Sequence, residues 1–187
     1  MKSLQYLANL PSAIPATADD ILEFHAARLL LLILFCGTKS PKGAPAKIEG
    51  LTKMAKLDFF VRYPEFFDKL TAHIQNQKRD FPNVESSMVR HHYGPWDKRY
   101  YHVLAYLESK ELISVQKNKN AYLFYLTAQG QEVAETLGKR KPFEGLVSQM
   151  QAVKSLLGNK KGSHLKKLIY DVFQEEVAHR SLGEVIR

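Results

Sequence analysis

The sequence has a single cysteine, Cys36, and no apolar run long enough to cross a bilayer. One cysteine excludes an internal disulfide and favours a reducing compartment. The most apolar stretch, residues 29–36, is about a third of the roughly 20 residues that a membrane-spanning helix needs. Residues 1–16 lack the apolar segment of a secretory signal peptide. We therefore expect a soluble, cytoplasmic protein with no membrane partner.

Acidic residues are few as well, because 19 Asp and Glu stand against 27 Lys and Arg and leave a net charge of +8 over 187 residues. A basic balance makes polyanions the first partner class to consider, although it also serves solubility alone. The sequence contains neither a nucleotide-binding G-x-x-x-x-G-K-S/T loop nor a G-x-S-x-G nucleophile motif. Clusters of acidic residues typical of nucleases are missing too. We predict a protein that is not an enzyme and needs no cofactor.

A metal site is not expected either. His91 and His92 are adjacent, and neighbouring side chains of an extended segment point to opposite sides. Cys36 lies in the most apolar predicted helix and is expected to be an inert, buried thiol.

Most of the chain has the apolar spacing of helices. Pro11 and Pro15 keep an N-terminal arm, residues 1–16, irregular. Thr17, Thr127 and Ser163 are placed to cap helices through their hydroxyl groups. The expected helices cover residues 21–35, 48–63, 64–75, 96–111, 128–137 and 143–157 and the segment after Ser163.

Two β-rich runs, residues 112–115 and 121–126, are separated by the polar turn 116–120 and predict a hairpin. Helices, then this hairpin, then another helix are the element order of a winged helix. The segments LAYLESKELI (104–113) and YLTAQG (125–130) resemble the end of MarR- and PadR-like winged helices. In such a fold the threonine caps the helix that closes the core, and the glycine allows close packing.

The expected fold class is therefore mainly α with a small β-hairpin wing, a winged helix-turn-helix with added N- and C-terminal helices. We divide the chain into the arm, a winged-helix domain over residues 17–137 with a helical insertion at about 64–93, and a helical extension over residues 138–187.

In a winged helix, the predicted helix 96–111 takes the position that reads DNA. Lys98, Arg99 and His102 lie near its start, and Lys117 and Lys119 lie on the wing. These residues are suited to phosphate contacts, whereas side chains that reach base edges are missing and Asp97 would repel phosphate. The pattern favours backbone-level DNA contact or a protein-binding wing over sequence reading. Further basic residues that belong to the candidate DNA-binding set are Lys139, Arg140, Lys141, Lys160 and Lys161.

A closer resemblance emerges from three further segments. They are GLTKMAKLDFFVRYP (50–64), YGPWDKRY (93–100), and LKKLIYDVF (165–173) followed by LGEVI (182–186). Together these segments resemble the small winged-helix middle component of bacterial ABC-three-component and Lamassu-type defence systems, which act against phages and plasmids. The chain departs from that pattern at residues 174–175, where Gln-Glu stands in place of Pro-Glu.

This resemblance implies a non-catalytic accessory subunit that bridges or regulates an SMC-like ATPase and a nuclease effector, with double-stranded DNA as a further partner. The candidate partner-binding residues are Tyr93, Trp96, Asp97, Tyr100, Tyr101, Tyr170 and Phe173. The alternative is a free-standing MarR- or PadR-like transcription regulator.

Two interpretations of the YGPWDKRY segment are open at this point. Trp96 with Asp97 and Arg99 would make a contact patch, because tryptophan and arginine are frequent interface anchors. Alternatively, Trp96 packs under the start of its own helix while Asp97 pairs with Arg99 or Arg62. Asp58 is expected to pair locally with Lys56 or Arg62. The pattern does not decide whether the aromatic residues Tyr100, Tyr101, Phe66 and Phe67 face the core or a partner.

Overall fold

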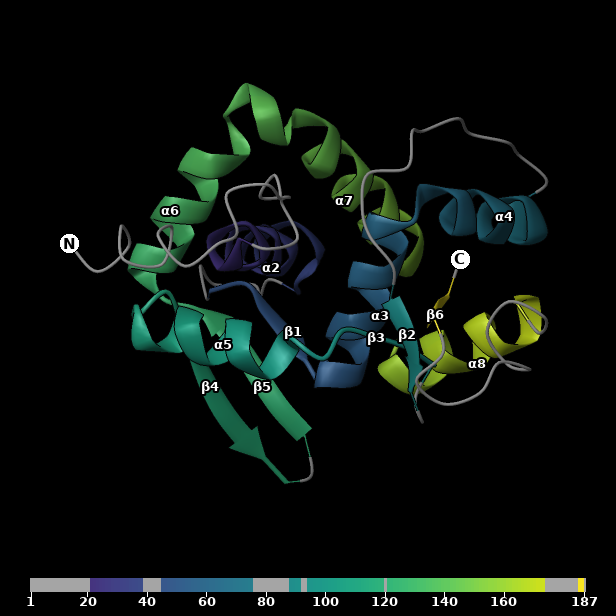
Figure 1. Cartoon of the computed structure of the whole chain (residues 1–187), viewed down its shortest axis with the longest axis horizontal. Coiled ribbons are helices and arrows are strands. Elements are labelled where there is room, and N and C mark those ends of the chain that lie inside the picture. The colour runs from purple at the N-terminus through teal and green to yellow at the C-terminus, as the bar shows by residue number, and fades with distance from the viewer. Residues whose placement is uncertain are drawn as a thin grey trace, which may run out of the picture.

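A computed structural model of the chain describes residues 21–38, 45–75, 88–91, 94–119, 121–173 and 185–186. These residues form a mainly helical fold, as the sequence predicts, with a small three-stranded antiparallel sheet that adds one strand to the expected hairpin and a second small three-stranded sheet (Figure 1). The helices are α2 (Leu22–Cys36), α3 (Leu51–Arg62), α4 (Pro64–Gln75), α5 (Tyr100–Ser109), α6 (Ala128–Gly138), α7 (Glu144–Leu157) and α8 (Gly162–Val172). The strands are β1 (Lys47–Glu49), β2 (Met88–His91), β3 (Gly94–Trp96), β4 (Ile113–Asn118), β5 (Ala121–Leu126) and β6 (Val185–Ile186), and a 3-10 turn, η2, covers Lys141–Phe143.

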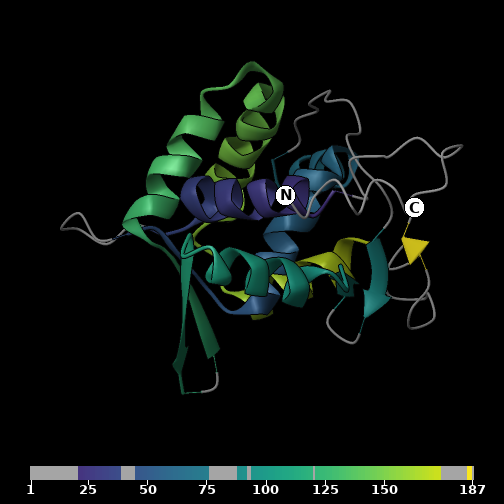
Figure 2. The same cartoon turned by 60° about the vertical axis from the view of Figure 1, so that its left-hand side comes forward.

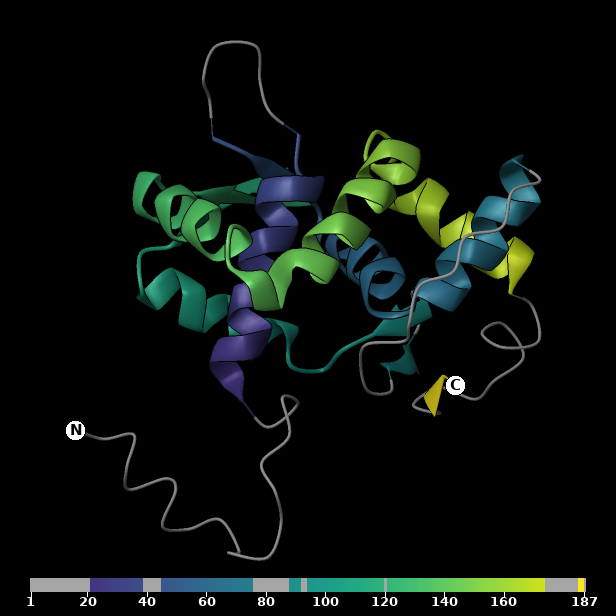
Figure 3. The same cartoon turned by 90° about the horizontal axis from the view of Figure 1, so that it is seen from above.

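Helix α2 forms the centre of the fold and packs against α3, α5, α6 and α7 (Figures 1 and 3). Its apolar residues point in nearly every direction, so neighbours must cover it all round, and ten of its residues are buried. The predicted helix over residues 21–35 is thereby confirmed, although its expected cap, Thr17, lies outside the described residues. The helix ends at Gly37, where the backbone becomes extended, and the position requires glycine because a β-carbon there would lie 2.2 Å from the backbone oxygen of Ile33.

The small sheet has the strand order β1-β5-β4. The predicted hairpin is confirmed, but β4 continues to Asn118, so residues 116–118 belong to the strand instead of the turn. The expected helix start near Ile48 is wrong, because Ile48 is a buried residue of β1 opposite Phe124. Gly50 follows with a φ of 85°, a conformation that favours glycine, and α3 begins at the next residue. The hairpin projects from the body of the molecule (Figure 2).

The predicted helix over residues 96–111 is also wrong at its start. The segment Gly94–Trp96 is strand β3, which pairs with β2, and α5 begins only at Tyr100. The region expected as a helical insertion, 64–93, therefore contains strand β2 in addition to α4, and residues 76–87 lie outside the described part. β6 pairs with β2 on its other edge.

The junction between the hairpin and α6 depends on two neighbouring residues. Thr127 caps α6 as predicted, since its Oγ1 accepts a 2.9 Å hydrogen bond from the backbone N–H of Gly130. Gly130 packs against the backbone of Leu112, whose carbonyl oxygen lies 1.8 Å from the place where a β-carbon would stand. By contrast, the cap expected at Ser163 is wrong, because α8 already includes Gly162 and begins without a side-chain cap.

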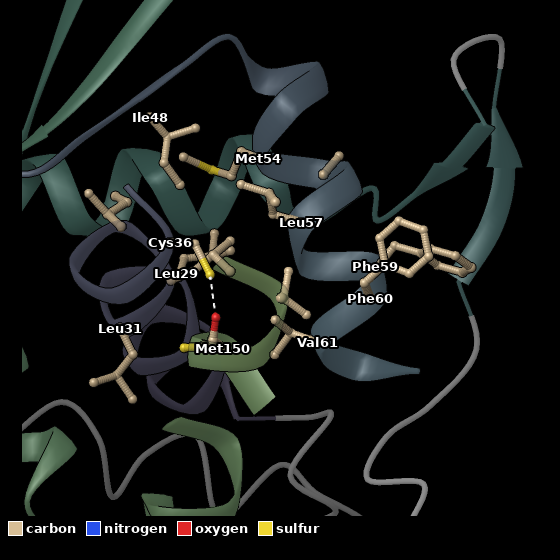
Figure 4. Packing of buried hydrophobic residues seen from close by; sticks show 14 of the residues in the cluster. Leu29, Leu31, Cys36, Ile48, Met54, Leu57, Phe59, Phe60, Val61 and Met150 are labelled. Atoms are coloured by element: carbon tan, nitrogen blue, oxygen red, sulfur yellow. Dashed lines mark hydrogen bonds between the residues drawn. The ribbon is translucent and has the colours of Figure 1, made fainter. Parts of the chain in front are cut away.

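The apolar core lies between α2, α3 and α7 (Figure 4). In its middle, the Cys36 thiol donates a 3.3 Å hydrogen bond to the carbonyl oxygen of Met150. Burial raises the pKa of Cys36 to about 12, an effect that Lys154 opposes only in part, and the thiol is therefore inert as expected. Lys154 also donates to the carbonyl oxygens of Cys36 and Gly37 at the end of α2, where a cation is favourable.

Among the described helices, none combines the length and the apolar character that crossing a membrane would require.

Candidate interaction surface

Asp58 is the centre of a buried polar network that connects α2, α3 and α5. Its Oδ1 accepts a 2.9 Å hydrogen bond from Nε of Arg28, and its Oδ2 accepts one of 2.8 Å from the Tyr100 hydroxyl. All three side chains are at most 1 % exposed. Asp58 therefore pairs with residues of α2 and α5 that are distant in the chain, and its expected local pairing with Lys56 or Arg62 stays a prediction. Burial and the neighbouring carboxylate raise the pKa of Tyr100, which keeps its hydroxyl a donor.

Asp97, just before α5, binds two arginines. Arg62 donates to its Oδ2 at 2.8 Å, and the guanidinium of Arg99 donates to both of its oxygens, at 2.7 Å to Oδ2. Burial raises the pKa of Asp97, but the hydrogen bonds from Arg99 and the charges of Arg62 and Arg99 outweigh it. The pKa therefore lies well below its usual range. The hypothesis that Asp97 pairs with Arg99 or Arg62 is confirmed, and it pairs with both.

His25 lies between the two halves of the network. Its Nδ1 is 2.8 Å from NH1 of Arg28, and its Nε2 is 2.8 Å from NH1 of Arg99. Guanidinium groups only donate, and a neutral imidazole accepts at one nitrogen only. A neutral ring would therefore accept a hydrogen bond from only one of the two arginines.

The network also holds two neighbouring aromatic residues, Trp96 and Tyr101, in place. Trp96 precedes Asp97, and its ring centre lies 5.4 Å from that of Tyr100 with an angle of 90° between the rings. Tyr101 follows Tyr100, and its ring centre is 6.1 Å from that of Trp96. Because Asp97 and Tyr100 are both tied to α3, Trp96 and Tyr101 have a rigid support.

A pocket of about 530 Å³ lies between α5, the start of α3 and the β4–β5 hairpin. Helix α5 contributes residues 101, 104, 105 and 108, which share one helix face by their spacing. Val115 and Phe124 are cross-strand partners in the hairpin, and Tyr122 lies two residues from Phe124 on the same sheet face. The lining residues are Leu51, Thr52, Trp96, Tyr101, Leu104, Ala105, Glu108, Val115, Tyr122 and Phe124.

This pocket is apolar and open to solvent at two tyrosines. Tyr101 is 66 % exposed and Tyr122 is 50 % exposed, although both are large aromatic residues. Such residues in a recess are typical of interaction sites, where aromatic side chains are enriched. Among the described residues that line it, the one charged side chain is Glu108. The Glu108 carboxylate accepts a 3.3 Å hydrogen bond from the backbone N–H of Val115, which holds it beside the hairpin.

The candidate partner-binding residues therefore divide into three groups. Trp96 and Tyr101 line the pocket, as a contact role requires. Asp97, Tyr100 and Phe173 are buried in the core or in the network, as is most of Trp96, and a partner contact by these residues stays a prediction. Tyr170 lies half-buried on α8, outside the pocket lining, and Tyr93 lies outside the described residues. Of the aromatic residues left undecided, Phe66 and Phe67 also belong to the core.

The candidate DNA-binding residues occupy separate regions. Lys98 and His102 are exposed beside α5, and Lys117 and Lys119 are exposed on the hairpin. Arg99 is only 35 % exposed, and its guanidinium is bound to Asp97. Lys139, Arg140 and Lys141 are exposed in the turn between α6 and α7, which lies at the opposite end of the molecule from the hairpin tip (Figures 1 and 2). Lys160 and Lys161 lie in the turn before α8, half-buried and exposed respectively.

Sequence reasoning missed most of the pocket and one half of the network. Leu104, Ala105 and Glu108 carried a usable signal, because with Tyr101 they repeat at helical spacing. Arg28 carried none, since its partner Asp58 is 30 residues away in the chain.

Among the described residues, no three His, Cys, Asp or Glu side chains are grouped to hold a metal ion. A second recess, of about 230 Å³ between α2, α5 and α6, is lined mainly by apolar residues.

A comparison of the chain with protein-family models, with curated proteins and with solved structures found no match.

Proposed function

We propose that this chain is a non-catalytic winged-helix accessory subunit of a bacterial defence complex in the cytoplasm. In that complex it bridges or regulates an SMC-like ATPase and a nuclease effector. The proposal combines the resemblance of three sequence segments to the middle component of such systems with the surface chemistry around α5.

The order of the elements supports the winged-helix part. Helix α2, strand β1, helix α3, helix α5 and the β4–β5 hairpin follow one another as in a winged helix, with β1 beside the hairpin. In this arrangement α4, β2 and β3 form an insertion between the second and third helices, and α7 and α8 form the C-terminal addition.

One observation carries the accessory role: an apolar aromatic pocket occupies the face on which a winged helix presents its reading helix to DNA. The exposed residues of α5 are Tyr101, His102, Ala105, Glu108 and Ser109. Only His102 among them is suited to a phosphate contact, and Glu108 would repel phosphate. A transcription regulator needs donors and acceptors for base edges at these positions. The surface favours a protein partner, with Lys98, Lys117 and Lys119 available for DNA backbone contact beside it.

The test is co-expression of this chain with the proteins encoded by its neighbouring genes, followed by affinity purification through the chain. We expect a stable complex with a large ATPase that survives gel filtration. Purification of the chain alone, together with binding to one operator sequence about a thousandfold tighter than to random DNA, would support the regulator instead.

A further inference from the structure

We infer that the pocket between α5 and the hairpin binds an arginine side chain from an apolar segment of a protein partner. The inference rests on the proposed function in taking the occupant to be a protein, and it adds the chemistry that the partner must present. Three features of the pocket point to this occupant.

The first feature is the aromatic wall. Trp96, Tyr101, Tyr122 and Phe124 come from β3, α5 and β5, and they surround the recess from both sides. A guanidinium group is planar and weakly hydrated, so it stacks on aromatic rings and is attracted by their faces. The two exposed tyrosines provide such faces at the rim.

The second feature is the sign of the charge. The protein carries a net charge of +8, yet the one charged residue among the described lining residues is acidic, Glu108. Its Oε1 accepts from the Val115 N–H, which fixes the carboxylate at the junction of α5 and β4. A fixed carboxylate beside aromatic rings is suited to bind the charged group of a side chain whose remaining atoms are aliphatic, as in arginine.

The third feature is the size of the recess. About 530 Å³ lies in the range of pockets that enclose a ligand, and its aliphatic residues Leu51, Leu104 and Val115 need an apolar counterpart. An arginine flanked by leucine-like side chains would occupy both the aromatic region beside Glu108 and the aliphatic region of the pocket. Lys117 is the cross-strand neighbour of Tyr122 nearer the hairpin tip, and it does not line the pocket. The arginine of the partner is therefore expected to bind beside Glu108, away from Lys117.

Other occupants fit less well. A single-stranded nucleic acid would stack on the tyrosines, but its phosphates need cations, and the described lining residues include neither lysine nor arginine. An acidic segment would meet Glu108. A second copy of this chain would have to offer an exposed arginine such as Arg140. The turn between α6 and α7 that holds it lies at the far end of the molecule, so this contact would join copies head to tail in rings or open chains.

Trp96 is the only tryptophan in the sequence and lines the pocket, so its fluorescence reports occupancy directly. The probes are three capped peptides of sequence Leu-X-Leu in which X is arginine, citrulline or glutamate. Citrulline keeps the shape of arginine and removes the charge. We expect the arginine peptide to change the emission of the full chain with a dissociation constant about tenfold lower than that of the citrulline peptide.

The matched variants are Glu108→Gln in the pocket and Glu132→Gln, the same change at an exposed residue of α6. Glu108→Gln is expected to bind the arginine and citrulline peptides alike, whereas Glu132→Gln behaves as the wild type. Equal binding of the two peptides to the wild type, or the absence of any change up to 10 mM peptide (a concentration about tenfold above a dissociation constant of about 1 mM), would overturn the inference.

Two further results would overturn the inference by identifying a different occupant of the pocket. Quenching of Trp96 by oligothymidine, strengthened in Glu108→Gln, would identify a single-stranded nucleic acid. Self-association that Tyr101→Ala abolishes in light scattering would identify a second copy.

The same variants separate this inference from the proposed function. If Glu108→Gln co-purifies with the ATPase as well as the wild type does, the inference fails and the proposed function stands. If the arginine peptide binds as expected and no ATPase co-purifies, the pocket chemistry stands and the proposed function fails.

Discussion

The hydroxyl of Tyr100 lies 2.8 Å from Oδ2 of Asp58, and this bond fixes the first turn of α5 to the middle of α3. The bond is fully buried and its acceptor is also held by Arg28. Tyr100 contacts Trp96 and directly precedes Tyr101 in the chain. The hydrogen bond from Tyr100 to α3 therefore fixes the positions of these two residues, which line the pocket.

Removal of this hydroxyl is expected to destabilise the fold. Tyr100→Phe should lower the free energy of unfolding by roughly 1.5–3 kcal/mol, because a buried hydrogen bond to a charged group is removed. Urea denaturation measures this change. Tyr101→Phe is the control, since that side chain is largely exposed and its change should stay within about 0.5 kcal/mol. Equal stability of Tyr100→Phe and the wild type would contradict the network.

Asp97 is expected to make stability depend on acid. Its carboxyl pKa is lower in the folded chain than in the unfolded chain, so its contribution is present above the unfolded pKa and is lost as the pH falls through the folded one. Asp97→Asn removes that contribution and leaves Arg62 and Arg99 without their carboxylate, at a cost of roughly 3–5 kcal/mol near pH 7. The gap between wild type and variant should narrow as the pH falls below about 4. A gap that stays constant between pH 7 and 3 would contradict this account.

Lys56 is expected to make stability rise with pH in the alkaline range. Burial, with a smaller effect of Lys166, lowers its pKa to about 7. The unfolded lysine keeps its proton up to about pH 10, so stability rises with pH between about 7 and 10. Lys56→Met should be more stable than the wild type at pH 6, by up to several kcal/mol, and the advantage should shrink toward pH 10. Lys167→Met, at an exposed position of α8, provides the comparison and should show no such trend.

Two glycines should respond in opposite ways to the same change. Gly130→Ala places a β-carbon 1.8 Å from the backbone oxygen of Leu112 and should destabilise the chain strongly, because backbone must move. Gly145→Ala meets nothing within 4 Å inside α7 and should be neutral or stabilising by up to about 1 kcal/mol. Thermal unfolding of the two variants checks this, and similar melting temperatures would contradict the packing of α6 against the hairpin.

Local signals explain what could be predicted from the sequence. The apolar residues of α2 and the Thr127 cap act within a few residues, so the pattern alone indicates them. Strand β1 is three residues long and pairs with β5 far along the chain, so the helical spacing around it is misleading. Strand β3 is equally short and pairs with the neighbouring strand β2, a pairing that three residues are too few to indicate.

The candidate site was harder to predict, for the same physical reason. Asp58 contacts Arg28 and Tyr100 only once three helices have packed, and its charged neighbours in the sequence give no indication of these two partners. The pocket needs α5 and the hairpin to face each other, which the spacing of Tyr101 and Glu108 within α5 cannot specify.

DNA binding by the isolated chain is expected to be weak and independent of sequence. Lys117→Ala combined with Lys119→Ala should make its salt dependence less steep, by about 0.9 in the logarithmic slope for each phosphate that is no longer neutralised. Fluorescence anisotropy with two unrelated duplexes over a range of salt concentrations measures this. A strong preference for one duplex would count against the surface described here.

The central claim is that the α5–hairpin face binds a protein instead of reading DNA. It is tested most directly by measuring the affinity of the purified ATPase partner and of duplex DNA for the wild type and for Tyr101→Ala combined with Tyr122→Ala. The account predicts that the variant binds the ATPase at least tenfold more weakly, a difference of about 1.4 kcal/mol, and binds DNA as the wild type does. Unchanged affinity for the ATPase, with loss of tight DNA binding, would contradict it.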